Sequence, residues 1–293
     1  MKKKIFYGTA TALITPFCEG KIDYAALDLI IERQILCGIK TLVVGGTTAE
    51  AATLSAPERE ELYEFARAKT RGRAALILGT GTNDTEEVIS RTKLAERVGC
   101  DAALVVTPYY NKGTVRGVSE HYFKAAYCTD LPIIVYNVPS RTGVNLTLSQ
   151  LEEFAKCEKI IGVKEATDSI DRFMKIAALG EDLPLYSGND NSIYTALTLG
   201  GGGVISVLSN LLPGEVEYIS ESYFKGEYEK SRQRQLELLP VIDAMFIETN
   251  PSPVKYAMSL FGFCQDEVRL PLSTPTQKTR ELIQRVIHGW IPV

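Results

Sequence analysis

Short apolar runs rich in β-branched residues recur along the chain at intervals of about 30 residues. Because each run is short and bounded by glycine or polar residues, it predicts a buried strand. The expected strands cover residues 10–15, 41–45, 74–79, 102–107, 133–137, 161–164, 185–187 and 204–207. Between them, apolar residues return with helical spacing, for example over 24–37, 57–70 and 85–98. This alternation is typical of repeated βα units and therefore of a parallel sheet.

The strand pattern stops after residue 214, and helices are then expected over residues 215–226, 228–246, 253–261 and 277–287. Eight parallel strands with crossover helices close most naturally into a (β/α)8 barrel. We therefore predict an α/β fold: a TIM barrel with the active site in residues 1–226, and a C-terminal helical layer packed on it in residues 227–293. An open doubly wound sheet fits less well, since no G-x-G-x-x-G motif follows the first strand.

One lysine lies where a strand is expected to end. Side chains alternate along a strand, so Gly162, Lys164 and Ala166 share one face, and the neighbours of the lysine are too small to cover it. An ammonium group costs several kcal/mol to bury without a partner. A desolvated lysine has a lowered pKa, and the neutral amine attacks carbonyl groups to form a Schiff base. A strand-end lysine with its amine in water is the plainer alternative.

Other polar residues are expected at the carboxyl ends of the strands, where TIM barrels carry out their chemistry. Thr47 and Thr48 follow the second strand, and their hydroxyl and nearby N–H groups suit a small carboxylate. Tyr136 shares a face with Ile134, so its phenol is placed to exchange protons with a neighbour. Arg141 lies on the loop beyond, and its planar guanidinium suits a carboxylate. The plainer interpretations are a helix N-cap for the threonines and a solvated loop residue for the arginine.

Composition narrows the range of functions. The formal net charge of −4 argues against a general nucleic-acid or anionic-membrane binder, and no apolar run approaches the length of a membrane span. Six cysteines lie scattered without C-x-x-C spacing, as expected for reduced thiols in a cytoplasmic protein. The two histidines are far apart in the sequence, so a zinc site or a Ser-His-Asp triad is poorly supported.

Together, the strand-end residues suit Schiff-base chemistry on an α-keto acid. Lys164 would attack the keto carbon, the hydroxyl and N–H donors would hold the acid, and Tyr136 would shuttle protons before the enamine attacks a second carbonyl. The protein then supplies the electron sink itself, so neither an organic cofactor nor a metal is expected. A barrel that binds a small acid without turning it over is the alternative, and it would not be captured covalently by a keto acid.

Three motifs make the chain resemble a known family. The segments GTTAE at residues 46–50, YNVPSRTG at 136–143 and GVKE at 162–165 are similar to those of the dihydrodipicolinate synthase (4-hydroxy-tetrahydrodipicolinate synthase) family. That family belongs to the pyruvate-dependent class I aldolases, together with N-acetylneuraminate lyase. The resemblance covers essentially the whole chain. It implies condensation of pyruvate with L-aspartate-4-semialdehyde, a step towards diaminopimelate and lysine.

The resemblance also implies a role for each site residue. Lys164 would form the Schiff base, and Tyr136 would donate and accept protons. Thr47 and Tyr110 would complete a proton relay, with Tyr110 supplied by a neighbouring subunit of a homotetramer built as a dimer of dimers. The remaining substrate contacts would come from Thr48 and the Ile205 backbone at pyruvate, Arg141 at the carboxylate of the semialdehyde, and Gly188 in the pocket wall. Another pyruvate-dependent aldolase, such as N-acetylneuraminate lyase or a keto-sugar-acid aldolase, is the alternative, although Arg141 favours a product with two carboxylates.

Some positions depart from the family pattern. Three residues match the lysine-effector site that the resemblance implies: Asn83, Glu87 and Tyr109. Three others stand where inhibited members carry a serine and two polar or aromatic residues: Ala51, Ala56 and Arg59. Because the Arg59 charge would repel a lysine ammonium, we expect weak or absent inhibition by lysine. Ala49 replaces the usual glycine after the two threonines, so a positive φ there would be strained.

Overall fold

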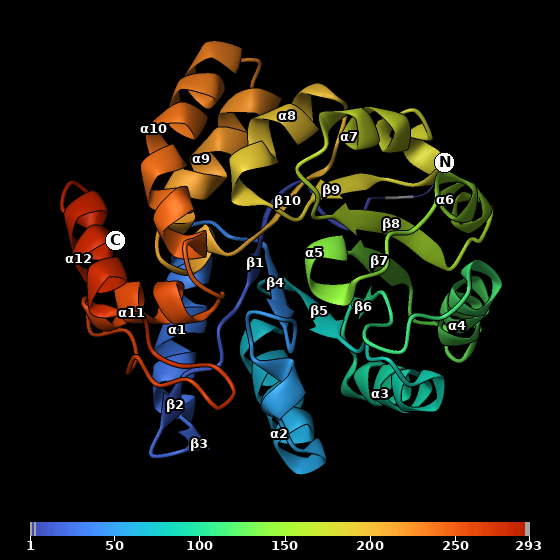
Figure 1. Ribbon diagram of the computed structural model, residues 1–293, viewed down its shortest axis with the longest axis horizontal. Coiled ribbons are helices and arrows are strands. Elements are labelled where there is room, and N and C mark those ends of the chain that lie inside the picture. The colour runs from blue at the N-terminus through green and yellow to red at the C-terminus, as the bar shows by residue number, and fades with distance from the viewer. Residues whose placement is uncertain (1, 3, 291–293) are drawn as a thin grey trace.

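In the computed structural model, which describes residues 2 and 4–290, eight parallel strands close into a barrel (Figure 1). β1 closes it by pairing with both β10 and β4. The strands are β1 (Gly8–Ala12), β4 (Thr41–Val44), β5 (Ala75–Gly79), β6 (Ala102–Val106), β7 (Ile133–Asn137), β8 (Ile160–Glu165), β9 (Leu185–Ser187) and β10 (Gly203–Ser206). The predicted (β/α)8 barrel is therefore confirmed. The first strand ends at Ala12, three residues earlier than expected, and the chain continues as buried coil.

A helix follows each barrel strand and packs on the outside of the sheet. These helices are α1 (Tyr24–Leu36), α2 (Ala56–Thr70), α3 (Thr85–Val98), α4 (Val115–Tyr127), α6 (Leu148–Ala155), α7 (Ile170–Ala177), α8 (Ile193–Thr198) and α9 (Pro213–Phe224). Local signals explain their ends: the Ser55 side chain and Glu58 form a capping box at the start of α2, and Gly99 stops α3 with a left-handed φ of 84°.

Shorter elements decorate the two ends of the barrel. They are the hairpin β2 (Phe17–Cys18) and β3 (Lys21–Ile22), the one-turn helix α5 (Pro139–Thr142), and the 3-10 turns η1 (Ala51–Thr53), η2 (Gly180–Asp182), η3 (Asp190–Ser192) and η4 (Leu208–Asn210). The sequence does not predict these elements, because each is too short to show a periodic pattern of apolar residues.

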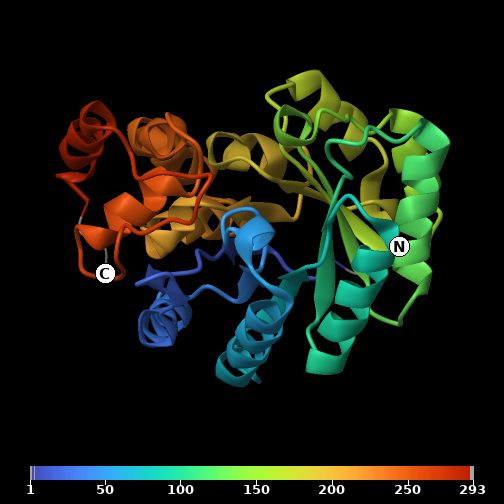
Figure 2. The same cartoon turned by 60° about the horizontal axis from the view of Figure 1, so that its bottom comes forward.

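Three further helices form a layer beside the barrel, drawn orange to red in Figures 1 and 2. They are α10 (Tyr228–Phe246), α11 (Ser252–Ser259) and α12 (Gln277–Ile287). α10 packs on α9 and on α12, so the layer continues the outer ring of helices. The predicted helical extension is therefore present, while the division into domains at residue 227 stays a prediction.

The apolar core has two parts, as strand alternation requires. One face of each strand fills the barrel interior, with Ile77, Ile134 and Ile205 among its buried residues. The opposite face packs under the helices, with Val135 and Val163 among its buried residues. Within residues 2 and 4–290, no helix is long and apolar enough to cross a membrane.

Candidate active site

A cavity of about 170 Å³ lies at the carboxyl ends of the strands, where the sequence places the chemistry. The predicted residues that line it are Lys164, Tyr136, Thr47, Thr48, Arg141 and Gly188. They come from β7, β8 and the loops after β4, β7 and β9, so the fold brings together residues up to 141 positions apart. Ile205 is buried in the barrel interior and is not among the residues that line this cavity, so its role stays a prediction.

Lys164 lies inside the barrel mouth with only 5% of its surface exposed. Burial lowers its pKa from 10.5 to about 7; the Asp190 carboxylate opposes the shift, and the Arg141 charge adds to it. The Lys164 Nζ atom lies 4.2 Å from the centroid of the Tyr136 ring. Near neutral pH a substantial fraction of this amine is therefore uncharged and nucleophilic.

Gly188, just beyond β9, gives the lysine its space. A Cβ atom at this position would lie 3.1 Å from Cε of Lys164 and 2.7 Å from Cβ of Ala166. A side chain here would therefore displace the reactive amine, which explains the glycine in physical terms.

Tyr136 is buried beside Lys164 on the neighbouring strand, with which it is in register. Burial raises the pKa of the phenol, while the Arg141 charge and a hydrogen bond from the Thr47 side chain lower it. The phenol is therefore protonated at neutral pH and already linked to Thr47, as a proton-transfer pair requires.

Thr48 and Arg141 meet through a residue of the C-terminal layer. The Asn250 side chain donates from Nδ2 to the Thr48 Oγ1 atom at 3.0 Å. The Arg141 guanidinium donates from Nη2 to the backbone oxygen of Asn250 at 3.3 Å. Arg141 thus lines the cavity, and this bond uses only one of the N–H donors of its guanidinium.

A second cavity of about 350 Å³ adjoins the first and shares Thr47, Tyr136, Arg141 and Asn250 with it. Tyr109 lines this second cavity. Tyr110 does not: it is 88% exposed and has a left-handed φ of 74°. Within one chain, therefore, Tyr110 does not join Tyr136 and Thr47 in the proton relay that the resemblance implies. That role would require Tyr110 from another subunit.

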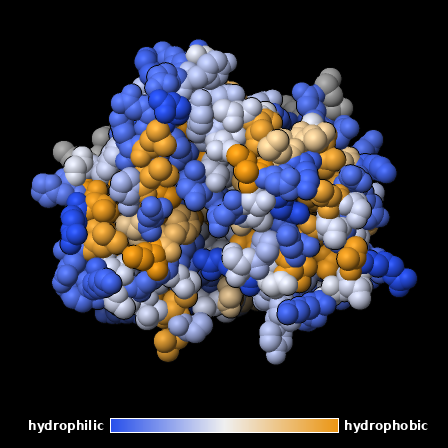
Figure 3. Space-filling view, turned by 45° about the horizontal axis from the view of Figure 1, so that its top comes forward, coloured by the Kyte–Doolittle hydropathy of each residue, from blue (hydrophilic) through white to orange (hydrophobic). Residues whose placement is uncertain are grey.

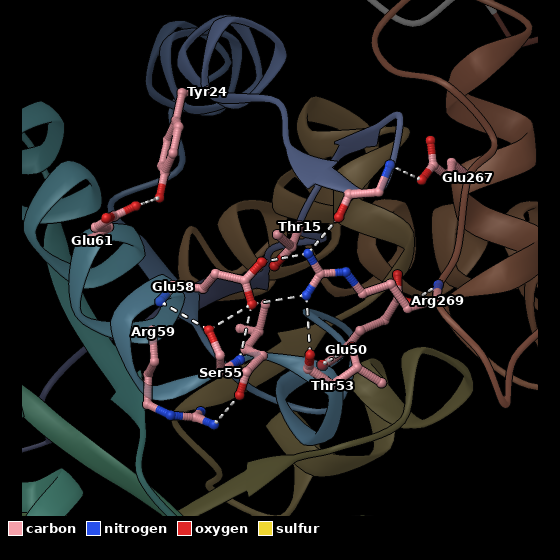
Figure 4. Close-up of polar contacts among 12 residues, drawn as sticks. Thr15, Tyr24, Glu50, Thr53, Ser55, Glu58, Arg59, Glu61, Glu267 and Arg269 are labelled. Carbon is pink, nitrogen blue, oxygen red and sulfur yellow. Dashed lines mark hydrogen bonds and ion pairs between the residues drawn. The ribbon is translucent and has the colours of Figure 1, made fainter.

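Of the positions predicted for a lysine effector, Tyr109 lines this second cavity, and the Thr82 hydroxyl group lies within hydrogen-bond distance of both Tyr109 and Asn83. Glu87 forms an ion pair with Arg91 at 2.8 Å, so its charge is already matched. Arg59 is buried and donates to the backbone oxygens of Ala51 and Leu54. Figure 4 shows the Arg59 guanidinium on one side of the loop, opposite the side where Arg269 meets Glu58 and Thr53.

In the turn after Thr47 and Thr48, the residue with a positive φ is not the one at position 49, where the family pattern has glycine. Ala49 is buried and does not have a positive φ. The left-handed position is Glu50, with φ 55°. Ala49 is therefore tolerated without strain, and Glu50 carries the unusual backbone conformation.

Sequence reasoning misses two buried polar residues at the site, Asn250 and Asp190. The Asp190 Oδ2 atom accepts hydrogen bonds from the backbone N–H groups of Val207 and Leu208, each at 3.0 Å, and so fixes the chain beyond β10. An acid after the end of β9 is a signal that inspection of strand ends could have found. Asn250 carries no such signal, because it precedes a helix outside the barrel.

A metal centre is not supported by the described side chains. Across residues 2 and 4–290, no three His, Cys, Asp or Glu residues are grouped so that they could hold an ion. The arrangement instead has an amine whose pKa is lowered by burial, a phenol and two neighbouring hydroxyl groups, which suit covalent catalysis by the protein itself.

Comparisons with known proteins agree with this chemistry. Residues 5–289 match the model of the dihydrodipicolinate synthetase family. The 4-hydroxy-tetrahydrodipicolinate synthase of Endomicrobium trichonymphae is 42% identical over 289 residues, which are 98% of this chain and 99% of that protein. The crystal structure of dihydrodipicolinate synthase from Thermotoga maritima matches with a TM-score of 0.95 and 40% identity, covering 98% of this chain and 99% of that one. The enzyme from Aquifex aeolicus has the same TM-score, identity and coverage.

Proposed function

The chain belongs to the dihydrodipicolinate synthetase family, and on this premise we propose that it condenses pyruvate with L-aspartate-4-semialdehyde to 4-hydroxy-tetrahydrodipicolinate. Its place would be the biosynthesis of diaminopimelate and lysine. The observation that carries the proposal is a buried lysine, Lys164, with a pKa of about 7 beside a protonated phenol. This pair is what Schiff-base formation with a keto acid requires.

The first half-reaction uses Lys164, Tyr136 and the two threonines. The neutral amine of Lys164 attacks the keto carbon of pyruvate, and loss of water gives the imine. Thr48 and the nearby backbone N–H groups hold the carboxylate. Tyr136, hydrogen-bonded to Thr47, passes the protons that the carbinolamine gains and loses.

The second half-reaction requires an anion site as well. Loss of a proton from the methyl group of the imine gives an enamine, whose carbon attacks the aldehyde carbon of the second substrate while the aldehyde oxygen takes up a proton. The neutral amino group of that substrate then attacks the imine carbon and displaces the Lys164 amine, which closes the ring and frees the enzyme. Arg141 lines both cavities, whereas Lys164 lines the smaller one, and the Arg141 guanidinium would bind the carboxylate of that substrate. No cofactor takes part in this scheme.

Two experiments test the function. Borohydride added with pyruvate is expected to fix a reduced adduct on the peptide that contains Lys164, whereas a barrel that only binds acids would give none. A coupled assay then offers pyruvate with L-aspartate-4-semialdehyde or with N-acetylmannosamine. Turnover of the first pair alone supports the proposal, and turnover of the second would assign the chain to the alternative lyases.

Replacing Tyr136 with phenylalanine tests the proton-transfer role. We expect kcat to fall by about 10²–10⁴-fold, because general acid–base catalysis contributes about that much, while pyruvate still forms the adduct slowly. Stopped-flow measurement of adduct formation and steady-state kcat check this. Normal turnover in the variant would contradict the assignment.

A homotetramer, a dimer of dimers, in the cytoplasm is part of the proposal. It is supported by the exposure of Tyr110, whose relay role requires a neighbouring chain. Apolar side chains also reach the surface in separate patches (Figure 3). Ile170 and Met174 on α7 are exposed apolar residues, with 61% and 55% of their surface accessible. Sedimentation equilibrium measures the assembly directly.

Weak or absent inhibition by lysine also follows from the proposal. The charges of Arg59 and Arg91 lie near the candidate effector position, and Arg91 already pairs with Glu87. An ammonium ion is repelled by such charges, so we expect more than half of the activity to remain at about 1 mM L-lysine. An inhibition curve with its midpoint well below this concentration would contradict the expectation.

A further inference from the structure

The outer face of β7 and β8 changes from apolar to polar at the last residue of each strand. Val135 and Val163 pack under the helices, whereas the next outward residues are Asn137 and Glu165. Both of these polar side chains are 0% exposed. Replacing a buried ionic group with apolar residues of similar volume is often neutral or stabilising, so stability alone does not account for the change.

The Glu165 carboxylate is held from two neighbouring elements. The Asn137 side chain donates from Nδ2 to both carboxylate oxygens, at 2.9 and 3.0 Å. The Arg172 guanidinium on α7 donates from Nε to Oε2 at 2.9 Å, and only 12% of the Arg172 side chain is exposed. Burial raises the pKa of the Glu165 carboxyl group, and the Arg172 charge and the hydrogen bonds from Arg172 and Asn137 oppose this shift. The network therefore ties the ends of β7 and β8 to the helix outside them.

Backbone hydrogen bonds of the same two residues extend the connection. Ala166 donates its N–H to the backbone oxygen of Asn137 at 3.0 Å, and Gly188 donates its N–H to the backbone oxygen of Glu165 at 2.7 Å. The Asn137 Oδ1 atom also accepts from the backbone N–H of Leu146 at 3.1 Å. The chain is thus joined across β7, β8 and the residue just beyond β9, at the level where these strands end.

The network lies directly behind the amine and the phenol of the site. β7 and β8 pair so that Tyr136 lies opposite Lys164, and the next residues, Asn137 and Glu165, lie opposite each other. Tyr136 and Lys164 line the 170 Å³ cavity. The described residues that line either cavity do not include Asn137, Glu165 or Arg172. The network therefore does not touch a substrate there, but a shift of one strand end against the other would move the amine relative to the phenol.

We infer that the Asn137–Glu165 pair, anchored by Arg172, positions the reacting amine and phenol by joining the ends of the two strands that carry them. This inference rests on the proposed function and extends it to residues that touch no substrate. Thr48, which is assigned to the carboxylate of pyruvate, follows β4, and β4 pairs with β1 and β5 rather than with β7 or β8. Pyruvate binding therefore depends little on the pair, whereas the rate of imine formation depends strongly on it.

The test measures the rate of pyruvate capture by the wild type and by Glu165→Gln over a range of pyruvate concentrations. Glutamine keeps the shape of the side chain but turns an NH₂ group towards the Asn137 amide or the Arg172 guanidinium, both of which donate. We expect the maximal rate constant to fall about 10- to 100-fold, since a misplacement of about 1 Å can cost about 10²-fold in rate. The pyruvate concentration at half of the maximal rate is expected to change less than about threefold, because binding of the carboxylate is retained.

Exchanging the two groups tests whether the pair itself is responsible. Asn137→Asp alone places two acids side by side and is expected to slow capture as well. In the double variant Asn137→Asp/Glu165→Gln the amide and the acid change places, so a donor again meets an acceptor and the glutamine oxygen still accepts from Arg172. We expect the double variant to capture pyruvate faster than either single variant, as directly interacting residues do. Should Glu165→Gln fail to fold, the comparison of Asn137→Asp with the double variant makes the same test.

Glu217→Gln is the matched control. The Glu217 carboxylate on α9 accepts from the backbone N–H of Thr9 at 2.8 Å, near the amino end of β1 and therefore at the opposite end of the barrel. This variant is expected to change the free energy of unfolding without changing the rate constant for capture. Urea unfolding of every variant sets conditions under which each protein is folded when its rate is measured.

The outcomes separate the two proposals. Normal capture in Glu165→Gln, a change confined to the pyruvate concentration at half of the maximal rate, or a double variant no faster than the single variants would overturn the positioning role and leave the proposed function standing. A wild type that forms no adduct would overturn both. A wild type that forms the adduct but does not turn over L-aspartate-4-semialdehyde would overturn the function, while the capture rates still decide the positioning role.

Discussion

Lys164→Ala is expected to abolish condensation, with kcat falling by at least about 10⁴-fold, because no other group replaces the amine that forms the imine. The borohydride adduct disappears in the same variant. The free energy of unfolding should change little. The substitution removes the cost of burying the Lys164 amine, and this gain offsets the lost packing of its methylene groups. Steady-state rates, mass spectrometry of the trapped protein and the free energy of unfolding measure the three effects.

A second buried lysine provides the control for this experiment. Lys255 is fully buried but bound to the Glu50 carboxylate at 2.7 Å, so its amine is held in a salt bridge away from the cavity that contains Lys164. Peptide mapping after trapping is expected to find the adduct at Lys164 alone. An adduct on the Lys255 peptide, or turnover that survives Lys164→Ala, would contradict the assignment.

The pH dependence of adduct formation gives an independent check. The reactive form is the neutral amine, so its fraction rises as pH rises through a pKa of about 7. The rate constant for pyruvate capture is therefore expected to rise about tenfold per pH unit below pH 7 and to level off above it. A rate that continues to rise to pH 10 would indicate an ordinary solvated lysine.

Strand alternation alone predicts the inner half of this site. Tyr136 and Lys164 occupy matching positions of neighbouring strands, and the residues that precede them, Val135 and Val163, face outward and pack under the helices. The period-2 pattern contains this information because each side chain must choose between two faces. The period-2 pattern does not show where a strand ends, because the end depends on hydrogen bonds to the neighbouring strands. Leu13, for example, still donates its N–H to Val43 although the first strand has ended.

The outer half of the site depends on contacts that no local pattern encodes. Asn250, Lys255 and Arg269 reach the Thr48–Glu50 segment across 202, 205 and 219 residues of sequence. Each comes from the C-terminal layer, whose sequence reads only as amphipathic helices and loops. Which of its polar residues face the barrel mouth depends on how the layer docks, and docking is a property of the whole fold. The layer is therefore part of the site, although composition and spacing assign it only a packing role.

Lys255→Met is expected to destabilise the protein strongly. The Lys255 and Glu50 side chains are both 0% exposed and bind each other at 2.7 Å. Removing the ammonium group leaves the Glu50 carboxylate buried, with the backbone N–H of Arg269 as a remaining donor. Breaking one partner of a buried ion pair typically costs about 3–5 kcal/mol in the free energy of unfolding, because the other charge stays desolvated. Urea unfolding measures this loss.

The double variant Glu50→Gln/Lys255→Met separates a buried charge from lost packing. It removes both charges with side chains of similar size, so we expect it to recover more than half of the stability lost in Lys255→Met. Losses that simply add would contradict an interaction between the two residues. Glu50 also has the left-handed backbone conformation that turns the chain after Thr48. Because loss of the ion pair would loosen this turn and shift the threonines, we expect Lys255→Met to slow pyruvate capture as well. Capture at the normal rate in a destabilised Lys255→Met protein would show that the ion pair supports the fold without positioning the threonines.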